Sequence, residues 1–134
     1  MSATTIDKIA LIHIVDGRVL GARSHGKDTY YFPGGKREAG ETDNETLIRE
    51  IEEELTVQII PESIAQFGTF AAEAHGKEAG VQVQMTCLTA DYKGTLAPAA
   101  EIAELAWLTF ADRERVSAVS RLIFDRLYEM KLLD

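Results

Sequence analysis

The chain has 134 residues, 46% of them hydrophobic, which is enough for the core of one compact domain. Its formal charge of -8 and isoelectric point near 4.9 argue against a nucleic-acid polymer as partner, because that binding depends on Lys and Arg neutralising phosphates. The single cysteine, Cys87, excludes an intrachain disulfide framework, and the apolar runs are too short to span a bilayer. We therefore expect a single domain over residues 1–134, located in the cytoplasm and without a membrane partner.

The first part of the chain predicts a hairpin followed by an irregular segment. The strand-like runs IALIHIV and RVLGAR flank Asp16 and Gly17, a pair typical of a tight hairpin turn. Residues 24–41 are rich in glycine and contain one proline, so regular structure cannot continue through them. We expect this segment to be a functional loop.

A helix is predicted from Thr42 to Thr56, where apolar residues recur at helical spacing. Either Thr42 or Asp43 can cap its start, and Glu45 follows Thr42 by three residues, as in a capping box. The sequence therefore specifies where this helix begins.

The second half of the chain predicts two long strands, a short strand and a helix. The runs AQFGTFAAEA and VQVQMTCLTADY indicate antiparallel strands joined by HGKEAG, and Ile102 to Leu108 indicates a third strand. The segment from Asp112 to Met130 is expected to form an amphipathic helix. Its apolar residues are Val116, Val119, Leu122, Ile123, Leu127 and Met130.

The first predicted helix carries an unusual acidic face. Glu50, Glu53 and Glu54 fall within an arc of about 100° at helical spacing. The adjoining apolar stripe consists of Leu47, Ile48, Ile51 and Leu55. A run of charges is usually a solvated face, but carboxylates this close repel one another unless a cation offsets them. Hard divalent cations use such oxygen ligands, and the upstream Gly34 and Gly35 leave the backbone accessible to a metal or a phosphate.

The segment GGKREAGETDNETLIREIEEELTV resembles the Nudix box, G-x5-E-x7-R-E-U-x-E-E-x-G-U, where U is a bulky aliphatic residue. The positions in register are Gly35, Glu41, Arg49, Glu50, Ile51, Glu53, Glu54 and Val57. The final glycine is replaced by Thr56. Because threonine avoids positive φ, we expect the helix to end differently here, with no ligand lost.

The order of strands and helices is also similar to that of the Nudix α/β/α sandwich. The resemblance implies an α/β fold with a mixed sheet and the Nudix helix packed against it. It also implies hydrolysis of a nucleoside diphosphate linked to another group, with Mg²⁺ or Mn²⁺ as cofactor. The expected partner is a small nucleotide, and the expected state is a monomer or a homodimer.

The resemblance assigns roles to individual residues. The implied metal ligands are Glu50, Glu53, Glu54 and the carbonyl of Gly34. Arg49 and Glu41 are implied to orient the catalytic glutamates, and Glu50, with Glu53 behind it, is the first choice for the general base. Many relatives use a further acid on a later loop. Here the candidates are Glu101 and Glu104, and we favour Glu101.

The substrate class is suggested by chain size and by one short motif. Small size and the FPGGK motif resemble the MutT-like branch, which favours a nucleoside triphosphate, oxidised or otherwise non-standard, cleaved to monophosphate and pyrophosphate. Alternatives are ADP-ribose, nucleotide sugars, dinucleotide polyphosphates, and a module that senses a nucleotide without cleaving it. Arg23 and Lys36 are weaker candidates for phosphate contacts. The only asparagine, Asn44, suits capping rather than base recognition, for which Gln82 and Gln84 are the substitutes.

The aromatic residues that can stack on a base are Tyr30, Tyr31, Phe32 and Trp107, although such residues in a small sandwich are more often part of the core. His13 alternates with apolar neighbours and is interpreted as an interior histidine rather than a ligand.

Overall fold

The computed structural model describes residues 4–73 and 80–134 of the chain. Its largest sheet has the strand order β4-β1-β7-β6. These strands are β4 (Gly34–Lys36), β1 (Thr4–Leu11), β7 (Val81–Thr89) and β6 (Ala65–Glu73). β1 and β7 are parallel, whereas the β1–β4 and β6–β7 pairs are antiparallel. The sheet is therefore mixed, as expected, and the two long strands predicted after residue 64 are confirmed.

Two smaller sheets complete the strand arrangement. One has the order β2-β3-β9, and the other pairs β5 with β8. Their strands are β2 (Ile14–Val15), β3 (Arg18–Ser24), β9 (Ile102–Leu108), β5 (Gln58–Ile59) and β8 (Tyr92–Lys93). The short strand predicted at the position of β9 is confirmed.

The predicted hairpin turn is present, but the strand before it is divided. Asp16 and Gly17 have φ of 51° and 76°, the two positive values that a type I′ turn requires. β2 and β3 flank this turn, whereas β1 ends at Leu11 and belongs to the other sheet. At the break, the N–H of Ile12 donates to Leu88 and the carbonyl of His13 accepts from Leu20. The prediction of one continuous strand was wrong because the chain passes from one sheet to the other here.

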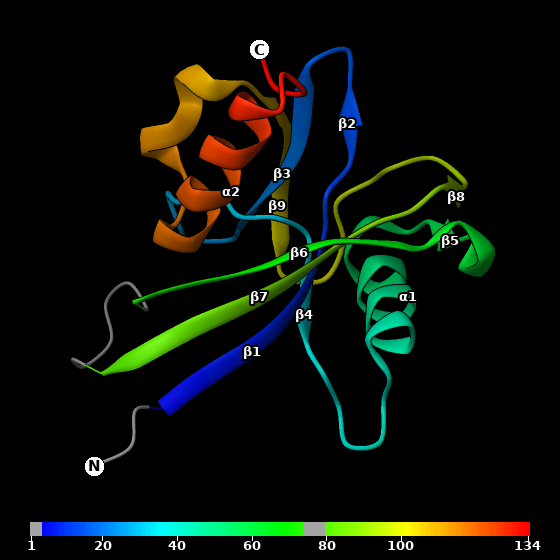
Figure 1. Ribbon diagram of the computed structural model, residues 1–134. Helices are drawn as coiled ribbons and strands as arrows, with labels where there is room; N and C mark the ends of the chain where they lie inside the picture. The colour runs from blue at the N-terminus through cyan, green and yellow to red at the C-terminus, as the bar shows by residue number, and fades with distance from the viewer. Residues whose placement is uncertain (1–3, 74–79) are drawn as a thin grey trace.

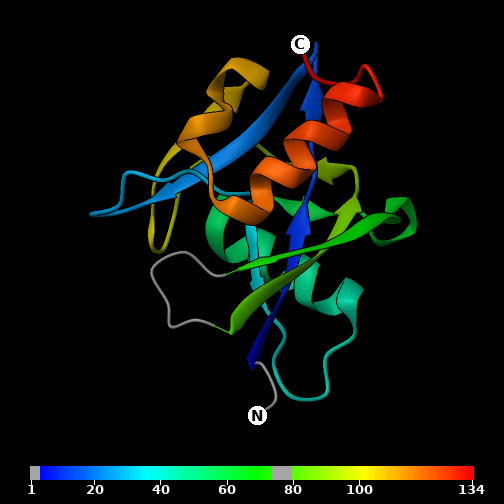
Figure 2. The same cartoon turned by 60° about the vertical axis from the view of Figure 1, so that its left-hand side comes forward.

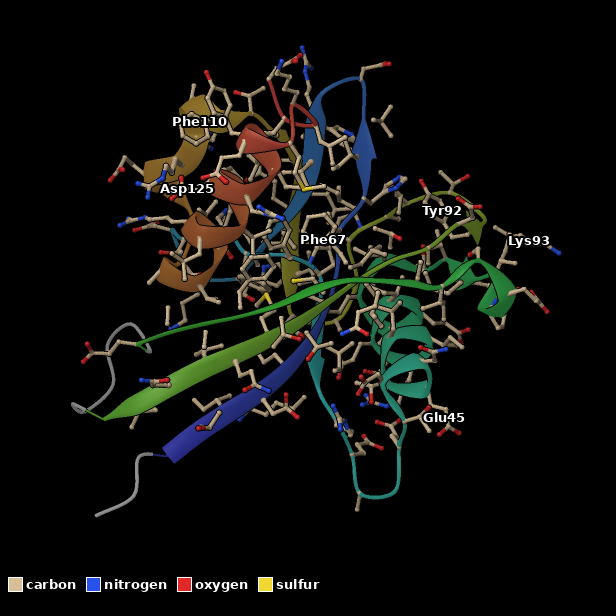
Figure 3. The ribbon with its side chains drawn as sticks, viewed as in Figure 1. Glu45, Phe67, Tyr92, Lys93, Phe110 and Asp125 are labelled. Atoms are coloured by element: carbon tan, nitrogen blue, oxygen red, sulfur yellow. The ribbon has the colours of Figure 1, made fainter. Side chains whose placement is uncertain are left out.

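Two helices, α1 (Asp43–Leu55) and α2 (Ala118–Glu129), lie on opposite sides of the large sheet (Figures 1 and 2). Successive residues of β1 alternate between them: Ile9 and Leu11 pack with the α1 side of the core, and Ala10 packs with the α2 side. Phe67 of β6 lies between the sheet and α2 (Figure 3). The expected α/β/α sandwich is therefore confirmed.

Both ends of α1 are defined by specific contacts. Thr42 is the N-cap, its hydroxyl accepting from the N–H of Glu45 while the Glu45 carboxylate accepts from the N–H of Thr42, so the capping box is confirmed. At the other end, Thr56 adopts the left-handed conformation with φ of 61°. The expectation of a different ending was wrong. The helix closes as it would with glycine, because the Thr56 N–H bonds back to Glu52.

The C-terminal segment differs from the predicted single helix. It begins with a 3₁₀ turn, η2 (Phe110–Arg115), and then becomes extended at Val116 before α2 starts. The reason is tertiary, because Val116 is buried and bridges Tyr30, whose carbonyl accepts from Ser117. Two of the predicted core positions are instead exposed, Leu122 and Met130. Phe110 of η2 and Asp125 of α2 lie on this side of the molecule (Figure 3).

The remaining segments are short. Another 3₁₀ turn, η1 (Pro61–Ser63), precedes β6. The predicted loop over residues 24–41 contains β4, which pairs with β1, so part of it is regular. The predicted connection HGKEAG lies outside the described residues except for Gly80. Within the part of the chain that is described, no helix is long and apolar enough to cross a membrane.

Replacing Thr56 by Gly tests the cost of this helix ending. A residue with a Cβ in the left-handed region is strained by about 1 kcal/mol, and glycine removes this strain. Part of the gain is offset because glycine loses more conformational entropy on folding. The lost hydroxyl contact to the Thr95 carbonyl is long, at 3.3 Å, and exposed. Thr56→Gly should therefore raise the free energy of unfolding by about 0.5 kcal/mol in urea titrations. Thr56→Ala, which keeps the Cβ, is the control and should give no gain; a destabilised glycine variant would contradict the interpretation.

Candidate active site

The site is built where α1 meets β4 with no side chains between the backbones. Gly34 has φ of 143°, and a Cβ placed on it would lie 2.0 Å from the carbonyl oxygen of Ile9. A Cβ on Gly35 would lie 2.5 Å from the carboxyl carbon of Glu50. Both distances are below any normal contact. At Gly34 the clash is with backbone, so glycine is required, whereas a side chain at Gly35 would displace the Glu50 carboxylate. The glycine pair thus brings the acidic face of α1 directly against the strand.

Arg49 is the hub of the acidic face. Its Nε and Nη2 donate to the two oxygens of Glu41 at 2.7 and 2.9 Å, a bidentate pair. Its Nη1 donates to Glu50 at 2.9 Å and to Glu53 at 3.5 Å. Nη2 also donates to the carbonyl of Lys36 in β4 at 3.1 Å. One guanidinium therefore ties three carboxylates of the predicted site to the glycine-bearing strand.

The pair formed by Glu41 and Arg49 is permanently charged. The hydrogen bond from Arg49 holds the pKa of Glu41 down at about 2, helped by the Glu38 N–H and the Thr46 hydroxyl. In turn, Glu41 raises the pKa of Arg49 above its already high value. Neither group exchanges protons near neutral pH, so the pair is a fixed ionic contact of the kind that the expected orienting role requires.

Glu54 is in the opposite electrostatic situation. Its side chain is 2% exposed and accepts the N–H of Gly34 at 2.9 Å. Burial, together with the neighbouring carboxylates of Glu101 and Glu50, raises the pKa of Glu54 to about 9. Burial also raises the pKa of Glu50, against the opposing effect of Arg49. In the absence of a cation, Glu54 is therefore protonated at neutral pH.

The structure distinguishes the two candidates for the later acid. Glu101 lies beside Glu54 and shares a side-chain hydrogen bond with it. Glu104 accepts from the Tyr30 hydroxyl at 2.5 Å and from Nε of Arg23 at 3.2 Å, away from the acidic face. Of this pair, only Glu101 lies next to the acidic face.

We call the carboxylates of Glu50, Glu53, Glu54 and Glu101 the acidic cluster. Among the described residues, no three His, Cys, Asp or Glu side chains are already arranged to hold a metal ion. The reason is visible in the contacts: Glu50 and Glu53 turn toward Arg49, and Glu54 toward Gly34. The donor set nevertheless fits a hard divalent cation, because it consists of carboxylate oxygens. Burial holds Glu54 protonated, and a cation could replace this proton.

The predicted phosphate contacts receive less support. Arg23 pairs with Glu104 and donates to the carbonyl of Lys27 at 3.0 Å, which occupies its guanidinium. Lys36 is exposed and directly follows the glycine pair in β4.

The predicted base-reading residues are distributed differently. Gln82 and Gln84 are exposed on β7, whereas the alternating Val83 and Met85 face a cavity, so the two glutamines are not part of it. Tyr30 and Phe32 are buried core residues. The exposed Trp107 is in contact with His13, which also packs edge-on against Tyr92. Burial lowers the pKa of His13, in keeping with a half-buried neutral histidine.

A cavity of about 230 Å³ adjoins the acidic cluster. It is lined mainly by apolar residues of β1, β7 and the start of α2, and its polar lining includes Lys8, Tyr31, Glu73 and Ser117. Gly34 and Gly35 form part of the cavity wall and also lie against the acidic cluster, Gly34 at Glu54 and Gly35 at Glu50. This cavity was not predicted from the sequence, because its walls come from segments far apart in the chain. The period-two alternation in β1 and β7 indicates only which residues of each strand share a face.

The comparisons with known proteins agree with this geometry. The NUDIX domain model matches residues 7–127. A relative from Halorhodospira halophila (strain DSM 244 / SL1), named RNA pyrophosphohydrolase, is 49% identical over 53 residues, 40% of this chain and 28% of the relative. The match thus spans less than a third of that protein.

Solved structures extend the likeness to nearly the whole chain. The ORF135 protein of E. coli superposes with a TM-score of 0.75 at 22% identity, covering 96% of this chain and 92% of that one. A MutT NUDIX hydrolase from Burkholderia pseudomallei gives 0.76 at 18% identity, covering 92% and 98%. At this identity the structures establish the shared fold. With the domain model matching residues 7–127 as well, the chain belongs to the Nudix hydrolase family.

Proposed function

We propose that this protein is a Mg²⁺-dependent pyrophosphohydrolase that cleaves a nucleoside triphosphate, ordinary or oxidised, to a monophosphate and pyrophosphate. The observation that carries the proposal is the sharing of Gly34 and Gly35 between the acidic cluster and an apolar cavity. A substrate with its nucleoside in the cavity has its phosphates at the carboxylates. The same geometry accommodates Mn²⁺ as a substitute ion.

The proposed metal ligands are the acidic cluster and the Gly34 carbonyl. Next to the β1–β4 ladder, the N–H of Leu11 donates to the carbonyl of Pro33. Hydrogen-bonded pairs alternate with non-bonded pairs in an antiparallel ladder, so the N–H and carbonyl of the next residue, Gly34, point away from β1. The Gly34 N–H points accordingly at Glu54. A bound Mg²⁺ neutralises pyrophosphate charge and lowers the pKa of a coordinated water.

The proposed general base is Glu50, with Glu53 as the second choice. The Glu50 side chain is 14% exposed and its pKa is raised by burial, which makes it a better proton acceptor than an ordinary carboxylate. Arg49 holds one of its oxygens at 2.9 Å and thereby fixes the direction of the other. Glu53 is more exposed, at 53%, and its contact to Arg49 is longer.

The cavity volume favours a substrate with one nucleoside. Pockets for drug-sized ligands measure roughly 300–1,000 Å³. At about 230 Å³, this cavity suits a single heterocyclic base rather than the two nucleosides of a dinucleotide polyphosphate. Its apolar walls match the faces of a flat ring. ADP-ribose and nucleotide sugars are alternative substrates; their terminal ribose or sugar would lie outside the cavity.

A second candidate substrate is the triphosphate at the 5′ end of RNA, because the Halorhodospira halophila relative is named an RNA pyrophosphohydrolase. The net charge of -8 disfavours extended contact with a polynucleotide. A site that holds only the terminal nucleotide avoids most of this repulsion.

A substrate screen tests the proposed function. Nucleoside triphosphates, oxidised analogues, ADP-ribose, nucleotide sugars, dinucleotide polyphosphates and a 5′-triphosphorylated RNA are incubated with Mg²⁺, and phosphate release is followed with and without pyrophosphatase. We expect pyrophosphate release to be fastest from a free nucleoside triphosphate. Faster cleavage of the RNA would establish the second candidate instead, and no cleavage of any compound would indicate a nucleotide-sensing module.

Replacing Arg49 by Lys should separate orientation from metal binding. A lysine keeps the charge but cannot reproduce the fork of donors to Glu41 and Glu50. We expect kcat to fall about 100-fold while Mg²⁺ affinity and KM change little, since misplacing a base matters chiefly in the transition state. Arg126→Lys, at an exposed ion pair on α2, is the matched control. Unchanged kinetics in Arg49→Lys would remove Arg49 from the catalytic arrangement.

The buried Glu54 predicts a specific dependence of stability on pH and Mg²⁺. Its pKa of about 9 in the folded protein lies above the usual value, so folding favours the protonated form. This contribution is complete below about pH 4.5 and is lost as the pH rises toward 9, by up to about 1.4 kcal/mol per pH unit. Without metal, Tm should therefore fall from pH 5 to pH 9. Added Mg²⁺ should raise Tm more at pH 8 than at pH 6, because it replaces the proton.

Calorimetry on Glu54→Gln checks this assignment. The amide oxygen can still accept the Gly34 N–H, but it carries no charge, so the metal-free variant should be more stable than wild type at pH 8 and lose the extra Mg²⁺ response. Glu53→Gln should reduce the Mg²⁺ response and the turnover, whereas Glu52→Gln, an exposed charge on another face of α1, should change neither. A pH-independent Tm in wild type would contradict the electrostatic assignment of Glu54.

A further inference from the structure

Two hydroxyl groups meet beside the acidic cluster and have no role in the function proposed above. The Ser24 hydroxyl, at the end of β3, is in hydrogen-bond contact with the Tyr31 hydroxyl. Two backbone hydrogen bonds between Ala22 and Tyr31, of 2.7 and 2.9 Å, hold the tyrosine alongside β3. Both side chains are half-buried. The contact is therefore a fixed part of the fold rather than a chance meeting of surface groups.

The hydroxyl pair is tied to the segment that carries Glu101. Ser24 pairs with Ile102, the residue directly after Glu101, at the start of β9. The next N–H along, that of His25, donates to the Glu101 carbonyl at 2.9 Å. The charges of Glu101 and Glu54 both act on the Tyr31 phenol and, together with its burial, raise its pKa. The phenol is thus a neutral donor close to the pair of carboxylates.

Tyr31 also lines the 230 Å³ cavity. The same residue therefore borders the space proposed for the nucleoside and lies within the electrostatic reach of the proposed loop ligand. The sequence gives no hint of this double placement, since Ser24, Tyr31 and Glu101 are separated by up to 77 positions, the difference between 101 and 24.

A count of protons shows that the hydroxyl pair has a donor to spare. Two hydroxyl groups carry two protons, and their mutual contact uses one, whichever group donates. The second O–H needs an acceptor, because a half-buried donor without one is costly. Carboxylates are the strongest acceptors near the pair, and the Glu101 segment is anchored beside Ser24 because its carbonyl accepts from the N–H of His25.

We propose that Tyr31 is a positioning residue: with Ser24 it donates the spare O–H to the Glu101 carboxylate and holds that carboxylate in place while a nucleotide fills the cavity. This inference rests on the proposed function and deepens it by linking substrate binding to ligand orientation. An occupied cavity restrains Tyr31, and a restrained Tyr31 restrains Glu101. Tyr31 itself does not touch the reacting phosphorus.

Tyr31→Phe is the direct test, measured on the full chain with Mg²⁺ and the best nucleotide of the screen. It keeps the ring that borders the cavity and removes the hydroxyl, so kcat should fall about tenfold while KM stays within about twofold. Ser24→Ala should give a smaller loss of the same kind. Tyr128→Phe, on the exposed part of α2 away from the site, is the matched control and should behave as wild type.

A double-mutant cycle separates positioning from a general structural effect. In the Glu101→Ala background the hydroxyl has no carboxylate to hold, so adding Tyr31→Phe should cost less than about twofold more. Full multiplication of the two losses, or a wild-type kcat in Tyr31→Phe, would overturn the inference. Tm measurements on each variant exclude unfolding as the cause. If wild-type protein cleaves no nucleotide, the proposed function itself fails, which is a different outcome from an active enzyme with an active Tyr31→Phe variant.

Discussion

The absence of two Cβ atoms is the constraint on which the site depends. A side chain at Gly34 would meet the backbone of β1, and one at Gly35 would meet the carboxylate of Glu50. Without them, α1 approaches β4 closely enough for Glu54 to take a backbone N–H and for Arg49 to reach the Lys36 carbonyl. The helix and the strand are therefore held by polar contacts at one end and by the apolar stripe along the rest.

This close approach buries the carboxyl group of Glu54. The carboxylates of Glu50 and Glu54 lie against the glycine pair, Glu53 and Glu101 lie beside them, and Arg49 offsets part of the repulsion. Two carboxylates of this region differ for a physical reason. Glu41, outside the cluster but paired with Arg49, stays ionised, whereas the buried Glu54 is protonated near neutral pH. A divalent ion would relieve the cost of ionising Glu54, which supports the proposed metal-activated site.

Local sequence patterns predicted the features that depend on neighbouring residues. The capping box at Thr42, the turn at Asp16 and Gly17, and the buried stripe of α1 all follow from spacing within a few positions. Tertiary contacts decided the rest. The break after Leu11 occurs because one chain segment serves two sheets, and Val116 leaves the helical pattern because it bridges Tyr30. Neither contact has a local signature, so periodicity alone cannot reveal it.

The candidate site divides in the same way. The motif located the acidic face, but only the fold shows that Glu101, just before β9, lies beside Glu54, whereas Glu104 within β9 pairs with Arg23. The cavity and the hydroxyl pair arise likewise from strands that meet far apart in sequence. In the proposed function, the chemistry is thus carried by a contiguous motif, whereas the choice of substrate depends on residues scattered along the chain. If that proposal holds, variation at cavity positions changes what is bound while the acidic cluster and its reaction stay the same.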